Sequence, residues 1–339
     1  MVISSSQLQS GDHKYDYLVR AIQVALSEFG VEGARIQFIS DTGNLIFRAD
    51  SQTQSIAIRV YKDCDMSISA INAELNWLVD IKHTTNLSVP EPITHQSAKM
   101  IQEITHPGAE KPVKVVLFHW IPGDIITSQL NHVSASQMGE MMATLHLHAC
   151  QFQLPENCFR DENDWRGMGH IKAGLSEIEI QNMESFLNKD QLEICEIAAR
   201  ITATTLHQVD ISHDFGLIHG DFQANNIILH HRMYSIIDFD DCQFAPFSND
   251  LAIALVSFDQ LPKPEPLRKA FLQGYSKVHN LPLNFETEME AFMMERRMRL
   301  LRWVATWPSL DYFPFGKALI ANSMHHLEKY VRKLSTEQS

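Results

Sequence analysis

Three polar side chains, Asp221, Asn226 and Asp238, have the types and spacing that suit transfer of a phosphoryl group. Asp221 and Asn226 share one short polar segment, and Asp238 follows the apolar pair Ile236 and Ile237. A carboxylate can accept the proton of a hydroxyl group. An amide oxygen and a second carboxylate can hold Mg²⁺, which prefers hard oxygen ligands. Phosphoryl transfer asks the protein mainly for positioning and charge neutralisation, and these side chains can supply both.

Short strands must position these side chains. The apolar runs at 227–229 and 236–237 are rich in β-branched residues, as buried strands are, and a turn at His231 and Arg232 joins them. Another short strand precedes Asp221. We therefore expect Asp221 and Asn226 on one loop and Asp238 close by at a strand end. The alternative, an acidic loop that closes a hairpin, explains the polarity but not the joint spacing.

The spacing His-x-Asp-x4-Asn around Asp221 resembles the kinase catalytic loop, and Asp238 with the following phenylalanine resembles the metal-binding Asp-Phe of kinases. His-Gly-Asp followed by Ile-Asp-Phe-Asp-Asp is similar to the aminoglycoside phosphotransferase and choline kinase superfamily. The resemblance covers roughly residues 36–275. It implies a two-lobed, protein-kinase-like α+β fold with a small antiparallel-sheet N-lobe and a mostly helical C-lobe. It also implies ATP and Mg²⁺ as cofactors, Asp221 as the catalytic base, and Asn226 and Asp238 as magnesium ligands.

The N-terminal part reads as a small sheet with flanking helices. The expected elements are a helix at 15–29, strands at 35–38, 45–48 and 55–61, a helix at 67–82 and a strand at 113–118. In a kinase-like lobe the turn between the first two strands lies over the nucleotide phosphates, so Thr42 and Asn44 are expected to bind nucleotide. A plain hairpin turn is the alternative.

The third strand carries a cation. Ile-Ala-Ile-Arg at 56–59 resembles the kinase Val-Ala-Ile-Lys. Strand alternation puts Ala57 and Arg59 on one face, where the small residue leaves room for adenine and the cation can reach the phosphates. The resemblance pairs Arg59, which replaces the usual lysine, with Glu74 on the following helix. An exposed strand arginine and a solvated glutamate are the alternatives.

The aromatic-Pro-Gly stretch from Phe118 to Gly123 resembles the hinge between the two lobes of the family. Its backbone at Phe118, His119, Trp120 and Ile121 is expected to bind the adenine edge, although Trp120 could equally be a core aromatic. The expected domains are an N-terminal nucleotide-binding lobe at 1–118, a hinge at 119–123, and a C-terminal catalytic and acceptor-binding lobe at 124–339.

Three features of the C-terminal part bear on the site. A helix at 134–149 is expected to start with a capping box at Ser134. Asp250 resembles the aspartate of the family's Asp-Leu-Ala, which braces the catalytic loop, while capping of a helix is its alternative role. Glu295, Arg296, Arg299 and Trp303 repeat at helical spacing and could line an acceptor cleft or form a packed face with a solvated edge.

Two features favour a small-molecule hydroxyl acceptor, and the resemblance implies one that is aminoglycoside-, choline- or homoserine-like. Gly220 stands where protein kinases usually have arginine, and the segment between Asp238 and Asp250 is too short for a long activation loop. A protein Ser/Thr kinase of the same superfamily and a nucleotide-binding pseudokinase or regulatory module are the alternatives.

Composition excludes other classes. The chain has 339 residues, 45% of them hydrophobic, and a net charge of −13 without a basic cluster, which argues against nucleic-acid binding. No apolar run is long enough to span a membrane. The five cysteines include no Cys-x-x-Cys, so we expect reduced thiols and a cytoplasmic location. The spacing of the histidines at 146 and 148 and the nearby cysteines matches no standard zinc site.

Overall fold

A computed structural model describes residues 16–41, 43–62, 66–95, 99–104, 112–160, 162, 165–261, 263–307 and 315–337. Thr42 and Cys64 lie outside the described residues. The chain divides into two compact units. Unit 1 consists of Met1–Ser128, Gln151–Arg160 and Asn225–Asp240, and unit 2 of Gln129–Cys150, Asp161–Ala224 and Asp241–Ser339. The lobe boundaries expected from the sequence stay a prediction.

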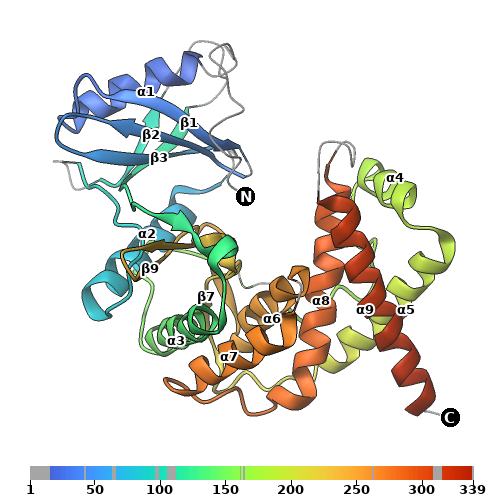
Figure 1. The fold of residues 1–339 in the computed structure, drawn as a ribbon. Helices are drawn as coiled ribbons and strands as arrows, with labels where there is room; N and C mark the ends of the chain where they lie inside the picture. Colours follow the sequence, from blue (N-terminus) through green and yellow to red (C-terminus); the bar gives the residue numbers. More distant parts are fainter. Residues whose placement is uncertain are drawn as a thin grey trace. The chain divides into compact units, whose positions relative to one another are not determined.

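Unit 1 contains a five-stranded antiparallel sheet in the order β1-β2-β3-β5-β4. Its strands are β1 (Arg35–Asp41), β2 (Leu45–Asp50), β3 (Ser55–Tyr61), β4 (Ile101–Ile104) and β5 (Val113–His119). Helix α1 (Asp16–Glu28) covers one face of this sheet (Figure 1), and its Leu18, Ile22 and Leu26 join the buried cluster around Phe47 and Leu117. The predicted strands and first helix are confirmed.

Helix α2 (Ile68–Thr84) and a small sheet complete unit 1. Ser67 caps α2 by accepting a hydrogen bond from the backbone N–H of Ala70. Strands β6 (Asp124–Ile125), β8 (Ile227–His230) and β9 (Met233–Ile236) pair in the order β6-β8-β9. His231 and Arg232 join β8 to β9 with φ of 45° and 70°, as the favoured two-residue hairpin turn requires. This confirms the predicted turn.

Unit 2 is mostly helical. Its elements are α3 (His132–Ala149), α4 (Glu177–Phe186), α5 (Lys189–Leu206), β7 (Phe215–Ile218), β10 (Gln243–Pro246), α6 (Phe247–Ser257), η4 (Phe258–Gln260), α7 (Pro264–Ser276), α8 (Phe285–Ala305) and α9 (Gly316–Glu337). Two further short 3₁₀ helices, η2 (Ile126–Gln129) and η3 (Ala224–Asn226), lie where the chain passes between the units. Helices α5, α8 and α9 share a buried apolar cluster that includes Cys195, Met298 and Leu327, and Figure 1 shows α8 beside α9. The expected combination of an antiparallel sheet and a helical part is confirmed.

The start of α3 differs from the prediction. Asn131, not Ser134, caps the helix, and its side-chain oxygen accepts the backbone N–H groups of Val133 and Ser134 at 2.8 and 3.3 Å. Ser134 occupies the third helical position and accepts the N–H of Asn131 at 2.8 Å. The helix therefore begins earlier than predicted, because asparagine supplies the cap and serine closes the capping box from inside.

Candidate active site

Arg59 and Glu74 form a buried ion pair in unit 1. Arg59 lies on β3 and donates from Nη1 to Oε1 of Glu74 at 2.5 Å, and the two residues are 6% and 0% exposed. The second terminal nitrogen of Arg59 lies 3.8 Å from Oδ1 of Asp238. Burial by itself would lower the pKa of Arg59, but the nearby carboxylates raise it well above its usual value. The guanidinium therefore stays charged and ties α2 to the carboxylate of Asp238.

Two residues that the sequence did not indicate also surround Glu74. The hydroxyl of Tyr61 lies 3.4 Å from Oε2 of Glu74, and burial together with this carboxylate raises the pKa of Tyr61. Arg160 places Nη2 at 3.5 Å from the same oxygen. Tyr61 could have been found, because strand alternation puts it on the face of Arg59. Arg160 follows an irregular segment and carries no such signal.

Asn226 and Asp238 leave neighbouring points of the β8–β9 hairpin. The backbone N–H of Ile237, which follows β9, donates to the carbonyl of Asn226 at 2.9 Å. Asp238 has a φ of +70°, a left-handed conformation that non-glycine residues rarely adopt, and its side chain is 50% exposed. One amide oxygen and one accessible carboxylate are hard donors, so this pair fits Mg²⁺, which usually keeps several waters or phosphate oxygens.

Of the two residues expected over the nucleotide phosphates, Asn44 is described. Its side-chain amide donates to Oδ2 of Asp240 at 2.9 Å. The backbone carbonyl of Asp240 accepts a second hydrogen bond from Arg160 Nη1 at 2.9 Å. The turn after β1 is therefore connected to the acidic segment that follows β9, and both belong to unit 1.

The expected adenine-binding stretch ends β5. Ala57 pairs with Phe118 across the β3–β5 ladder, and the Arg59 guanidinium lies 5.2 Å from the centre of the Phe118 ring. The N–H of His119 donates to Glu91 and that of Trp120 to Ser55, at 3.0 and 3.1 Å. A base bound here must therefore use other polar groups of the stretch, such as those of Ile121.

Trp120 is half-buried, so it is not a core aromatic. The Arg48 guanidinium on β2 lies 4.5 Å from the centre of its ring, a cation–π contact.

In unit 2, Asp250 holds the backbone that leads to Asp221. Its two carboxylate oxygens accept the N–H groups of His219 and Gly220 at 2.9 and 3.0 Å. Pro246 occupies the cap position of α6 and no side chain caps this helix, so bracing is the observed role of Asp250. Gly220 has a φ of +81°, and an added Cβ would lie 2.2 Å from the carbonyl oxygen of Asp241, which only glycine avoids.

A buried network supports this brace. His146 Nε2 lies 3.4 Å from Asp250, and His146 Nδ1 lies 2.8 Å from the hydroxyl of Tyr275. Burial lowers the pKa of His146, and Asp250 offsets this only in part. Burial would raise the pKa of Asp250, but His146 and the N–H of His219 outweigh it, so the pKa of Asp250 is lowered. Near neutral pH the network therefore holds a neutral imidazole and an ionised carboxylate.

Asp221 is held by three groups of unit 2. Arg296 of α8 donates from Nη2 to Oδ1 at 2.8 Å, and Gln223 donates to Oδ2 at 2.7 Å. The backbone N–H of Asp221 donates to Nδ1 of His219 at 3.2 Å, so the buried imidazole stabilises the loop. The carboxylate is thus oriented while its side chain stays 21% exposed.

The charged stripe of α8 has two different parts. Glu295 is buried and pairs with Arg299 Nε at 3.1 Å, as a packed face requires. Arg296 contacts Asp221, and Trp303 is 41% exposed. The packed-face alternative therefore describes Glu295, while Arg296 belongs to the surroundings of the predicted base.

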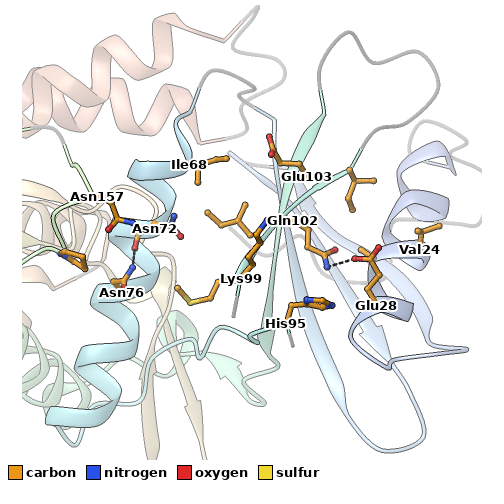
Figure 2. A pocket seen from close by; sticks show the side chains of 15 residues that line it. Val24, Glu28, Ile68, Asn72, Asn76, His95, Lys99, Gln102, Glu103 and Asn157 are labelled. Carbon is orange, nitrogen blue, oxygen red and sulfur yellow. Dashed lines mark hydrogen bonds between the residues drawn. The ribbon is translucent and has the colours of Figure 1, made fainter. Parts of the chain in front are cut away.

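A hollow of about 930 Å³ opens in unit 1 between α1, α2 and β4. Figure 2 shows Glu28 and Gln102 on one side, and Asn72, Asn76 and Asn157 on the other. The residues that line it include none of the predicted site residues.

No described helix is long and apolar enough to cross a membrane. Within the described ranges, no three His, Cys, Asp or Glu side chains gather as a metal site.

The sequence pattern of the phosphotransferase enzyme family matches residues 36–292. An amicoumacin kinase of Bacillus subtilis (strain 168) is 20% identical over 270 residues, which cover 76% of each chain. The structure of a microcompartment-associated aminopropanol kinase superposes with a TM-score of 0.79 at 22% identity and covers 93% of this chain and 98% of its own. An amicoumacin kinase in complex with AMP-PNP, Ca²⁺ and Ami gives a TM-score of 0.72 at 20% identity, with 94% and 96% covered. These likenesses confirm the expected kinase-like α+β fold.

Proposed function

Because this chain belongs to the phosphotransferase enzyme family, it is a phosphotransferase, and we propose that it moves the γ-phosphate of ATP to a hydroxyl group of a small molecule. One observation carries this proposal. The buried guanidinium of Arg59 lies between Glu74 and Asp238, at 2.5 and 3.8 Å. A fixed cation beside an accessible carboxylate is what binding of phosphates together with Mg²⁺ requires.

The nucleotide belongs to unit 1 in this proposal. Arg59 binds phosphate oxygens, Asn226 and Asp238 hold Mg²⁺, and the stretch from Phe118 to Ile121 receives the adenine. Bound Mg²⁺ neutralises the charge of the phosphate oxygens. The likeness to a kinase structure that holds AMP-PNP and Ca²⁺ supports a nucleotide and a divalent cation as ligands.

Asp221 is the base. It accepts the proton of the acceptor hydroxyl while the oxygen of that hydroxyl forms a bond to the γ-phosphorus and the bond from the γ-phosphorus to the leaving ADP oxygen breaks. Gln223 and Arg296 orient the carboxylate. We propose an aminoglycoside-, choline- or homoserine-like acceptor, in line with the amicoumacin and aminopropanol kinases that the chain resembles. We also propose a cytoplasmic location, because the described cysteines are free thiols.

The test is release of ADP from Mg·ATP in the presence of amino alcohols, hydroxy amino acids, sugars and aminoglycosides, each tested singly. Asp221→Asn should keep nucleotide binding and lose turnover by about 100- to 10,000-fold, the usual contribution of a general base. Full activity in that variant would remove Asp221 as the base. Transfer of label to protein instead of to small molecules would favour a protein kinase, and nucleotide binding without any turnover would favour a pseudokinase.

A further inference from the structure

Arg160 is a buried cation in unit 1, and it has no role in the proposed reaction. Its side chain is 9% exposed. Nη1 donates to the backbone carbonyl of Asp240 at 2.9 Å, and Nη2 lies 3.5 Å from Oε2 of Glu74. One guanidinium therefore joins α2 to the segment that begins with Asp238.

That segment needs outside support. Asp238 adopts a left-handed backbone conformation at φ +70°, which costs free energy in any residue with a Cβ and persists only where surrounding contacts impose it. Before Asp238, the Ile237 N–H bonds to the carbonyl of Asn226 at 2.9 Å. After it, Arg160 holds the carbonyl of Asp240 at 2.9 Å. The conformation of Asp238 is thus fixed from both sides.

The chain that leads to Arg160 is itself attached to α2. The hydroxyl of Ser69 donates to the carbonyl of Asn157 at 3.0 Å, and the amide of Asn76 donates to the sulfur of Cys158 at 3.6 Å. Figure 2 shows Asn157 on the side of the hollow where α2 carries Asn72 and Asn76. Because α2 also carries Glu74, the position of Arg160 is set by the same helix that positions Arg59.

Stability alone does not account for an arginine here. Its Nε and Nη2 are buried and, among the described residues, have no hydrogen-bond partner. Buried donors without partners cost stability, and replacing a buried ionic group by an apolar side chain of similar volume is often tolerated where no partner charge is left unpaired. Glu74 would still keep Arg59 at 2.5 Å. The presence of an arginine is therefore best explained by the Asp240 carbonyl that it holds in place.

We propose that Arg160 is a positioning residue for the metal-binding carboxylate. It keeps the backbone after Asp238 in place, so that this carboxylate is presented to Mg²⁺ in one orientation. The inference rests on the proposed function for the role of Asp238.

The test compares Arg160→Met with Arg166→Met, in which the arginine removed is 40% exposed and pairs with Glu162. The readouts are the affinity for a fluorescent ATP analogue across a Mg²⁺ series, amide hydrogen exchange at 238–241, and the thermal midpoint. In Arg160→Met we expect the Mg²⁺ concentration for half-maximal binding to rise by about 10- to 100-fold, as when an outer partner of a metal ligand is lost. Exchange at 238–241 should accelerate, while the midpoint stays within about 2 °C.

Arg160→Lys should give an intermediate Mg²⁺ requirement, because an ammonium group cannot reproduce the two-sided contact of a planar guanidinium. If Arg160→Met needs no more Mg²⁺ than the wild type, the inference is wrong and the proposed function stands. A fall in the thermal midpoint with equally weakened binding at every Mg²⁺ concentration would show a purely structural role and would also overturn it. If the wild type binds no nucleotide in a Mg²⁺-dependent way, the proposed function itself fails.

Discussion

Replacing Asp250 by asparagine keeps the shape of the side chain but removes one of the two hydrogen-bond acceptors that hold the loop carrying Asp221. Each carboxylate oxygen accepts one backbone N–H, from His219 at 2.9 Å and from Gly220 at 3.0 Å, and the side chain is fully buried. An asparagine offers one oxygen and one NH₂ group. One backbone N–H must therefore face another donor.

The loss has two parts. One charge-assisted hydrogen bond disappears, and a buried N–H is left without an acceptor, so we expect Asp250→Asn to lower the free energy of unfolding by about 2–4 kcal/mol. The backbone N–H that loses its acceptor belongs to His219 or Gly220, the two residues directly before Asp221. Misplacing this carboxylate should reduce kcat by about 10- to 100-fold.

Urea unfolding followed by circular dichroism, together with kcat at saturating ATP, measures both effects. Asp210→Asn is the matched control, because its exposed carboxylate accepts the N–H of Ser212 at 2.9 Å in a turn. This control should leave the unfolding curve and kcat nearly unchanged. If Asp250→Asn behaves like Asp210→Asn, the brace does not hold the loop and our reasoning is wrong.

Three further perturbations test other parts of the site. Gly220→Ala should cost at least about 1–3 kcal/mol of stability in thermal unfolding, since the residue has a φ of +81° and its added Cβ would meet the carbonyl of Asp241; it should also reduce kcat, and a stable, active variant would contradict this. Glu74→Gln removes the nearer of the two carboxylates beside the buried Arg59 and should lower the free energy of unfolding in urea by about 3–5 kcal/mol, whereas an unchanged midpoint would refute the ion-pair argument. Burial and the charge of Arg297 lower the pKa of His326 to about 4, so the unfolded chain takes up this proton first as pH falls from about 6.5, and stability should decline between those values. In His326→Gln, the free energy of unfolding in urea should depend less on pH over this range. An unaltered dependence would contradict the lowered pKa of His326.

The Arg59–Glu74 pair could be predicted because local rules specify both partners. Alternation fixes the face of β3 that carries Arg59, and the serine cap with the apolar stripe fixes α2. Arg160 could not be predicted, because the segment before it has no periodicity and joins unit 1 only through tertiary contacts. Likewise, the sequence left both bracing of the loop and capping of a helix open for Asp250. Only its hydrogen bonds to the backbone of a loop distant in sequence distinguish the two roles.

Asp221 and Asp238 are each held by residues of the unit to which they belong. Asp221 accepts hydrogen bonds from Gln223 and from Arg296 of α8 in unit 2. In unit 1, Asp238 lies beside Arg59, and Arg160 holds the backbone carbonyl of Asp240. Mutations at distant sites without shared partners usually have additive effects. A change at Arg296 should therefore alter turnover without altering the Mg²⁺ requirement for nucleotide binding, and a change at Arg160 should alter that requirement first. In the proposed reaction, two separately supported carboxylates keep different tasks, with Asp221 accepting a proton and Asp238 binding a metal, although only a short piece of chain separates them.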